Sequence, residues 1–297
     1  QWLNDDGCVE ADVTVAKLAK QEYMVVATDT AHRHVEARIR RVSEDEGLTR
    51  AYVFDVTGGM AQINIQGPRS RELLEEVVNE DLKAFPFRGV RKLQIGYAEV
   101  NAIRITYVGE LGFELFVGAE HAINVYDTLL SVGREHGLRH AGLKALGSLR
   151  LEKGYRDYGH DVDATDSIAE AGLSFTCDFS KPDGFIGQGA TLRDREKRGK
   201  KAPSKRLLSL KVLDPEPVLH HGEVLLRDGV VVGDVRAGSY GFTVGGAVGL
   251  AMVDSGGCSV NKQYIEDAEW KVDIGGILYP IHVSLRPLFD PKNLKIK

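Results

Sequence analysis

Residues 104–117 read Arg-Ile-Thr-Tyr-Val-Gly-Glu-Leu-Gly-Phe-Glu-Leu-Phe-Val, and this stretch sets polar side chains inside a pattern typical of a β-hairpin. Apolar residues alternate with polar ones on both sides of the Val-Gly-Glu-Leu-Gly bend. Gly109 and Gly112 allow a tight turn and let a flat ligand approach the backbone. We expect Tyr107, before the bend, and Glu114, after it, to lie side by side across the two strands.

Tyr107 and Glu114 together suit a planar heterocycle. A carboxylate offers two coplanar acceptors, which match the two N–H donors on an amino-pyrimidinone edge, and a tyrosine supplies a ring face and a hydroxyl. The alternative is a surface hairpin with a solvated Glu114. The pattern alone favours this alternative, because glutamates on strands are usually exposed.

The whole chain has 297 residues, enough for two or three domains with substantial cores. It carries 38 Lys and Arg against 43 Asp and Glu residues, so its formal net charge is -5. Basic side chains gather between residues 193 and 206, but acids and a proline interleave with them and no aromatic platform accompanies them. We interpret this segment as a solvated linker and expect no nucleic-acid partner.

Three cysteines are too few and too far apart for a disulfide framework or a tetrahedral metal site, so we expect no metal and a reducing compartment, the cytoplasm or the mitochondrial matrix. No apolar run approaches ~18 residues and no hydrophobic leader is visible, so we expect no membrane association. Neither a dinucleotide fingerprint nor a phosphate loop occurs. The chain enters a strand-like segment directly at Gln1, without a Met, and we expect it to be the interior of a longer protein.

The order of predicted elements indicates three regions. Residues 1–155 mix strands and helices without the rhythm of a doubly wound sheet, which favours an α+β region with mixed or antiparallel sheets. Residues 156–204 are expected to form a connecting loop and helix segment. Residues 205–297 show strand and turn patterns throughout, which predicts a small, partial β-barrel domain. In the first region the predicted strands include 51–56, 60–66, 92–99 and 101–107, and the predicted helices include 28–42, 119–136 and 141–154.

Asp12 lies in the strand-like sequence Glu-Ala-Asp-Val-Thr-Val. Val13 and Val15 define one face of this strand, and Asp12 shares the opposite face with Thr14. If that face lines a cavity, Asp12 is a buried carboxylate. The alternative, which the pattern favours, is an exposed strand face.

Arg150 lies near the end of the predicted helix 141–154. An arginine there complements the helix dipole and needs no further role. A guanidinium fork also suits a ligand carboxylate. The pattern leaves both interpretations open.

Seven ordered blocks over nearly the whole chain carry a resemblance to a known family. They are Leu-Asn-Asp-Asp-Gly-Cys-Val-Glu-Ala-Asp-Val-Thr-Val (3–15), Ile-Gln-Gly-Pro (65–68), Tyr-Val-Gly-Glu-Leu-Gly-Phe-Glu-Leu (107–115), Ser-Leu-Arg-Leu-Glu-Lys-Gly-Tyr-Arg (148–156), Glu-Ala-Gly-Leu (170–173), Phe-Ile-Gly (185–187) and Gly-Ser-Tyr-Gly-Phe-Thr-Val (238–244). The chain resembles the folate-binding aminomethyltransferase family, typified by the T-protein of the glycine cleavage system. It is most similar to the C-terminal, folate-binding part of sarcosine and dimethylglycine dehydrogenases.

This resemblance implies an aminomethyltransferase-like fold that binds tetrahydrofolate. It makes Asp12 the catalytic carboxylate beside the reacting folate nitrogens, Tyr107 and Glu114 the residues that recognise the pterin, and Arg150 an arginine that contacts the ligand. The implied activity is one-carbon transfer that forms 5,10-methylenetetrahydrofolate. The carbon would come from demethylation of a glycine derivative such as sarcosine or dimethylglycine.

The sequence departs from the family pattern in three ways. The N-terminal strands and first helix of the family are absent, and Phe289 stands where relatives often have Tyr. The flavin-binding module of the dehydrogenases is also absent, so we expect FAD only in a preceding module or in a flavoprotein partner.

Two other functions are alternatives to one-carbon transfer. One is a non-catalytic folate-binding subunit with a regulatory or structural role, against which the retention of Asp12 argues. The other is a folate-dependent O- or S-demethylase, which fits the 107–115 block less well.

Overall fold

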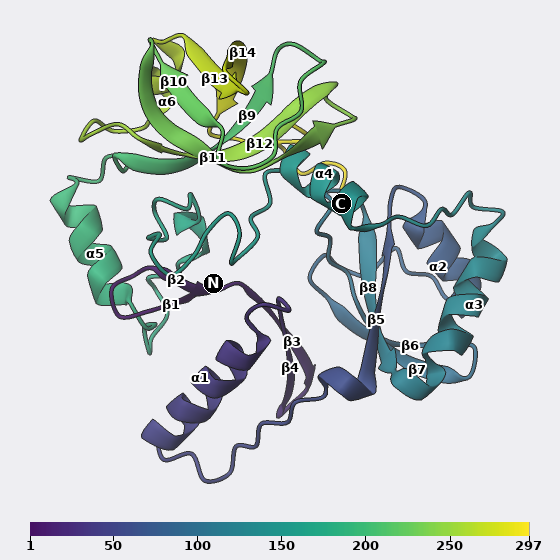
Figure 1. Cartoon of the computed structure of the whole chain (residues 1–297). Helices are drawn as coiled ribbons and strands as arrows, with labels where there is room; N and C mark the ends of the chain where they lie inside the picture. Colours follow the sequence, from purple (N-terminus) through teal and green to yellow (C-terminus); the bar gives the residue numbers. More distant parts are fainter. Residues whose placement is uncertain (297) are drawn as a thin grey trace. The chain divides into compact units, whose positions relative to one another are not determined.

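The computed structural model describes residues 1–296, and the chain divides into two compact units (Figure 1). The first unit comprises Gln1–Val13, Ala27–Ala31 and Gly147–Pro291. The second comprises Thr14–Val26, His32–Leu146 and the described residues from Lys292 onward. Each unit therefore combines segments that are distant in the sequence. Among the described residues, no helix is both long enough and apolar enough to cross a membrane.

A four-stranded antiparallel sheet, in the order β5-β8-β7-β6, forms the centre of the second unit. Two helices pack against one face of this sheet, where Phe113 and Leu115 are fully buried (Figure 1). The strands are β5 (Met60–Gln66), β6 (Val90–Ile95), β7 (Ala98–Ile103) and β8 (Gly112–Gly118), and the helices are α2 (Ser70–Val78) and α3 (Ala122–Gly133).

The opposite face of this sheet takes part in a smaller core. There Ile103 and Phe116 pack with Ala16 and Met24 from a two-stranded hairpin. That hairpin consists of β3 (Val13–Ala19) and β4 (Glu22–Ala27), and the unit also contains α1 (His32–Asp45) and two short 3₁₀ turns, η1 (Thr57–Gly59) and η2 (Ala119–His121).

The predicted hairpin around residues 104–117 is confirmed, but its strands end earlier than expected. β7 stops at Ile103, and residues 104–111 form a loop before β8. Glu114 therefore lies opposite Ile103, and the expected pairing of Glu114 with Tyr107 is wrong. At the end of this loop, the carbonyl of Leu111 does not pair with β7. It accepts hydrogen bonds from outside the hairpin, from the N–H of Gly67 and the hydroxyl of Ser70.

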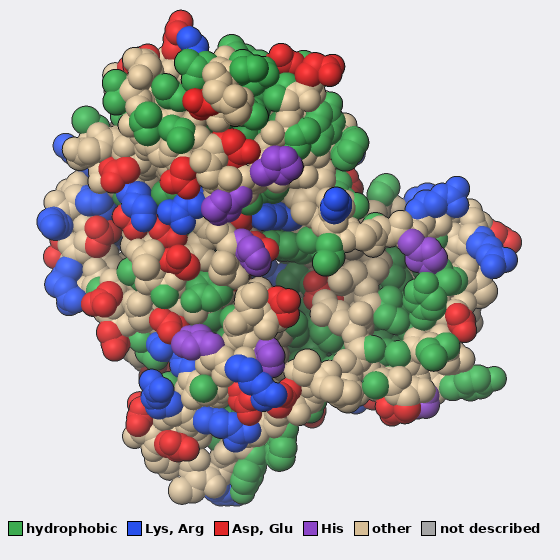
Figure 2. Space-filling model, viewed as in Figure 1, with side chains coloured by type: hydrophobic (Ala, Val, Ile, Leu, Met, Phe, Trp, Pro, Cys, Tyr) green, Lys and Arg blue, Asp and Glu red, His purple; other side chains and the backbone are tan. Residues whose placement is uncertain are grey.

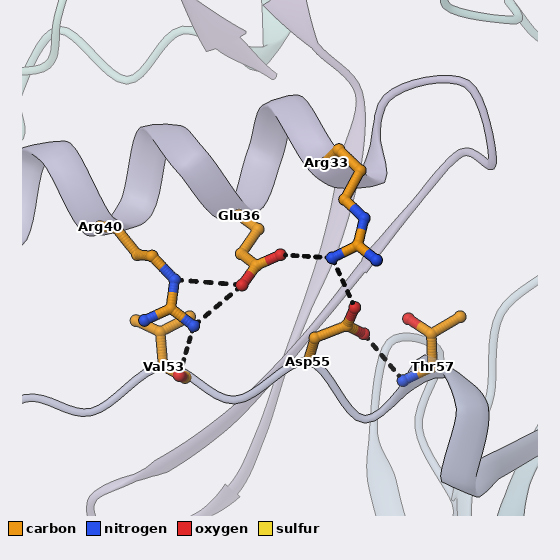
Figure 3. Close-up of polar contacts among 6 residues, drawn as sticks. All are labelled: Arg33, Glu36, Arg40, Val53, Asp55 and Thr57. Atoms are coloured by element: carbon orange, nitrogen blue, oxygen red, sulfur yellow. Dashed lines mark hydrogen bonds and ion pairs between the residues drawn. The ribbon is translucent and has the colours of Figure 1, made fainter.

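The strand predicted at 51–56 is also wrong, because this segment is held by side chains of α1 instead of by a neighbouring strand (Figure 3). The guanidinium of Arg40 donates to the carbonyl of Val53 at 3.0 Å. That of Arg33 pairs with Asp55 at 3.2 Å. The β-branched and aromatic residues of the segment are typical of a strand, but these tertiary contacts decide its conformation.

In the first unit, residues 205–284 form a closed six-stranded barrel in the order β10-β11-β12-β9-β14-β13. Pairing of β10 with β13 closes the sheet, so the expected partial barrel is complete and has no free edge. The elements are β9 (Lys205–Val212), β10 (Val224–Arg227), β11 (Val230–Gly241), β12 (Gly246–Asp254), α6 (Lys262–Glu266), β13 (Trp270–Ile274) and β14 (Ile277–Ser284).

Strand β12 is buried on both faces, which explains its almost continuous apolar sequence. Ala251 and Val253 point into the barrel core. Leu250 and Met252 point outward into a second core shared with Leu151. The barrel is thereby fixed to the rest of its unit. That part contains β1 (Trp2–Leu3), β2 (Val9–Ala11), η3 (Ser174–Thr176), α5 (Gln188–Lys197) and, from Gly147 onward, α4 (Leu143–Glu152).

Charged side chains of both signs are interspersed on the surface. The face seen in Figure 2 shows Lys and Arg side chains among Asp and Glu side chains. The basic segment 193–206 begins inside α5, where Arg198 pairs with Asp194 at 2.7 Å. Such local pairing weakens the positive field that a polyanion would require.

The end of α4 is attached to the barrel by Glu152, whose side chain is only 1% exposed. One carboxylate oxygen accepts hydrogen bonds from the backbone N–H groups of Thr243 at 2.7 Å and Val244 at 3.0 Å. These residues form the turn between β11 and β12. The buried carboxylate thereby satisfies two backbone donors of this turn.

Glu152→Ala should lower the free energy of unfolding by roughly 1–3 kcal/mol, because two part-buried backbone N–H groups lose a charged acceptor. Glu152→Gln keeps an acceptor oxygen and should cost much less. Urea denaturation measures both variants, with the exposed α5 residue Glu196 changed to Ala as the control. Equal losses in the Ala and Gln variants would contradict this role for the acceptor oxygen.

Candidate functional site

The four predicted site residues are divided equally between the two units. Tyr107 and Glu114 belong to the second unit, and Asp12 and Arg150 belong to the first. Within the second unit, Tyr107 lies on the loop that leads into the strand of Glu114.

Glu114 lies in the middle of β8, between Asn64 on β5 and Ile103 on β7. It is half-buried, and its carboxylate makes no hydrogen bond or ion pair with another described residue. Burial raises the pKa of this carboxyl. A half-buried carboxylate on a central strand, without a partner and with a raised pKa, marks a candidate binding site.

Two further acceptors lie on the same face of the sheet. The side-chain oxygens of Gln66 and Asn101 are buried and have no hydrogen-bond partner. Gln66 lies opposite Gly112, and Asn101 lies opposite Phe116, so both share a face with Glu114. This polar face was missed in the sequence analysis. The alternation Gln-Ile-Asn-Ile-Gln over 62–66 is the signal that could have revealed it.

The loop 104–111, which carries the half-buried Tyr107, is anchored at both ends. At its start, the guanidinium of the buried Arg104 donates to the carbonyls of Phe85 at 2.7 Å and Ile296 at 3.1 Å. At its end, the hydroxyl of Ser70 donates to the carbonyl of Leu111 at 3.1 Å. These contacts limit the movement of the loop and hence of Tyr107.

Asp12 connects β2 with β3 and is half-buried. The pKa of Asp12 is raised, mainly by burial. A hydrogen bond with the Gln1 side chain lowers this pKa, and the nearby Asp157 carboxylate raises it further. The predicted apolar face of this strand is wrong, because Val15 is 54% exposed whereas Ala16 is 3% exposed. Ala16 packs into the small core of the second unit, and this packing decides which face of β3 is buried.

Arg150 has an internal partner. Its guanidinium forms an ion pair with Asp161, whose side chain is fully buried, and donates to the carbonyl of Tyr155 at 3.1 Å. Asp161 also accepts from the backbone N–H of Asp157 at 2.9 Å. Arg150 thus fixes the loop 155–161, including Asp157 near Asp12. Direct contact between Arg150 and a ligand stays a prediction.

The described residues contain no group of three or more His, Cys, Asp or Glu side chains placed to hold a metal ion. Phe289 has no hydroxyl, and its backbone N–H donates to the carbonyl of Glu152 at 2.9 Å. The chemistry available from the predicted residues is therefore hydrogen bonding, ring stacking and proton transfer by carboxylates.

Comparison with known proteins identifies both parts of the chain. Residues 1–181 match the GCVT N-terminal domain, and residues 205–290 match the glycine cleavage T-protein C-terminal barrel domain. The crystal structure of glycine cleavage system aminomethyltransferase T from Bartonella henselae shares the fold. It has a TM-score of 0.79 and 21% identity, over 97% of this chain and 74% of that chain.

Sequence relatives include longer proteins. The chain is 37% identical to 4-methylaminobutanoate oxidase (formaldehyde-forming) of Paenarthrobacter nicotinovorans, over 100% of this chain and 34% of that protein. It is 33% identical to mitochondrial sarcosine dehydrogenase of Mus musculus, over 99% of this chain and 33% of that protein. It is also 30% identical to an aminomethyltransferase of Caldanaerobacter subterraneus, over 88% of this chain and 67% of that protein.

The chain spans about a third of the length of the oxidase and of the dehydrogenase. Its two family-model matches extend from residue 1 to residue 290 and are interrupted only between 181 and 205. The unpaired carboxylate on a central strand and the closed barrel lie within these matches. The chain therefore belongs to the glycine cleavage T-protein family of folate-binding aminomethyltransferases.

Proposed function

We propose that this chain binds tetrahydrofolate and catalyses one-carbon transfer that forms 5,10-methylenetetrahydrofolate. The observation that carries the proposal is the half-buried carboxylate of Glu114, which has no protein partner on a face lined with other acceptors. Family membership and the names of the relatives support the same function.

The Glu114 carboxylate would accept hydrogen bonds from the 2-amino group and the N3–H of the pterin ring. Such paired, charge-assisted hydrogen bonds are short and directional, so they fix the plane of the ring as well as its position. Tyr107 would contact the ring from its anchored loop. Tetrahydrofolate itself supplies the two amine nitrogens that take up a carbon at the formaldehyde oxidation level.

Asp12 would accept a proton from the attacking amine and return it to the leaving group. A carboxyl with a raised pKa suits this role, because its proton affinity is closer to that of the reacting groups at neutral pH. The buried ion pair between Arg150 and Asp161 supports the loop near Asp12. In this proposal Arg150 is a positioning residue that acts through this loop.

The one-carbon donor is proposed to be an N-methyl amine that a flavoprotein module or subunit oxidises. Sarcosine or dimethylglycine would release a carbon at the required oxidation level when demethylated. The name of one relative specifies formaldehyde formation, and another relative is a sarcosine dehydrogenase. Both relatives are about three times as long as this chain.

Glu114→Ala should weaken binding of 5-formyltetrahydrofolate by about 1.5–3 kcal/mol, as expected for hydrogen bonds to a charged group. Isothermal titration calorimetry measures the affinity. The control is Glu99→Ala on β7, whose side chain is 61% exposed and pairs with Lys92 at the surface. If Glu114→Ala and Glu99→Ala bound the ligand equally well, Glu114 would not recognise the pterin.

The affinity should also depend on pH through Glu114. Protonation removes one of the two acceptors, so binding should weaken as the pH falls through the pKa of Glu114. Because burial raises this pKa, the loss should begin at a higher pH than for an ordinary glutamate with a pKa of about 4.3. Glu114→Gln should bind more weakly and should lack this phase of the pH profile; a wild-type profile in that variant would assign the titration to another group.

Asp12→Asn should separate catalysis from binding. Asparagine keeps the shape but cannot accept the proton, so formation of methylenetetrahydrofolate should fall by about 10² to 10⁴ while folate affinity changes only a few-fold. Single-turnover assays with formaldehyde and tetrahydrofolate measure the rate, and the exposed Asp5→Asn is the control. Full activity in Asp12→Asn would instead favour a non-catalytic folate-binding protein.

A further inference from the structure

Asn64 on β5 lies directly opposite Glu114 on β8 in the antiparallel register. Directly opposed residues project from the same face, with their Cβ atoms about 4.5–5.5 Å apart. Asn64 is exposed, whereas Glu114 is half-buried. No hydrogen bond joins the two side chains, so both are available to a ligand on this face.

The carboxamide of Asn64 is oriented by a neighbour on its own strand. The side-chain nitrogen of Gln62 contacts the Asn64 oxygen at 3.5 Å. The Asn64 nitrogen has no partner among the described residues. The pair Glu114 and Asn64 therefore presents two acceptor oxygens beside an amide donor.

We propose that Asn64 donates a hydrogen bond to the 4-oxo group of the pterin, beside the two hydrogen bonds to Glu114. This inference rests on the proposed function. The recognition edge of a 2-amino-4-oxopteridine presents two donors, the 2-amino group and N3–H, followed by one acceptor, the oxygen at position 4. Glu114 complements the donors, and Asn64 complements the acceptor.

Asn64 then determines specificity between 4-oxo and 4-amino pteridines. A 4-amino ring presents a donor where the 4-oxo ring presents an acceptor, and it has no hydrogen on N3. The amide N–H of Asn64 would face that donor without an acceptor between them. A site that leaves polar groups unpaired rejects the wrong ligand more strongly than a site that merely lacks one contact.

The test uses folic acid and aminopterin, which differ only in the oxo or amino group at position 4, as competitors of 5-formyltetrahydrofolate on the full chain. The wild type should prefer folic acid. Asn64→Ala should reduce this preference by about three- to ten-fold, the equivalent of one hydrogen bond. Asn64→Asp replaces the donor with an acceptor and should shift the preference further toward aminopterin than Asn64→Ala does. Glu99→Ala, on the surface of β7, should leave the preference unchanged.

The outcomes distinguish this inference from the proposed function. If the preference stays constant in both Asn64 variants while Glu114→Ala weakens both competitors, the role of Asn64 is refuted and the folate site stands. If Glu114→Ala affects neither competitor, the proposed function fails, and the inference fails with it. Asn64 is exposed, so thermal unfolding should show that both variants are folded.

Discussion

The pairing of β8 with β5 on one side and β7 on the other determines which side chains lie on each face of the sheet in the second unit. It sets Glu114 level with Asn64 and Ile103 and sends Phe113 and Leu115 to the opposite face. Because side chains alternate along a strand, a slip of one residue would exchange these faces. The apolar core under α2 and α3 therefore fixes the register, and the register presents the carboxylate.

This arrangement has an energetic cost that the core offsets. The buried acceptors of Gln66 and Asn101 forgo hydrogen bonds that water would provide, and the half-buried Glu114 carboxylate loses part of its hydration. On the other face, fully buried side chains such as Phe113 and Leu115 each contribute roughly 1.5–3 kcal/mol. Binding sites commonly retain such unfavourable groups, because their removal would stabilise the fold and abolish recognition.

Sequence patterns predicted the elements whose conformation depends on local periodicity. The hairpin before Glu114, the helix around Arg150 and the strands after residue 205 all follow from alternation or helical spacing. The predictions were wrong where contacts between residues distant in the sequence determine the backbone conformation. Residues 51–56 are held by arginines of α1, and the loop of Tyr107 is anchored by residues far away in the sequence. Closure of the barrel likewise depends on the pairing of distant strands.

The buried carboxylates show how structural and functional groups can be told apart when their sequence context looks alike. Glu152 accepts from two backbone N–H groups, and Asp161 is held by Arg150 and a backbone N–H, so both are satisfied within the fold. Glu114 has neither kind of partner. Glu152 and Glu114 both lie in ordered blocks that resemble the family, so the motif alone does not separate them. The supply of donors around each carboxylate does: Glu152 is satisfied by the barrel, whereas Glu114 keeps its acceptors unused, which is why ligand recognition is proposed for Glu114 and not for Glu152.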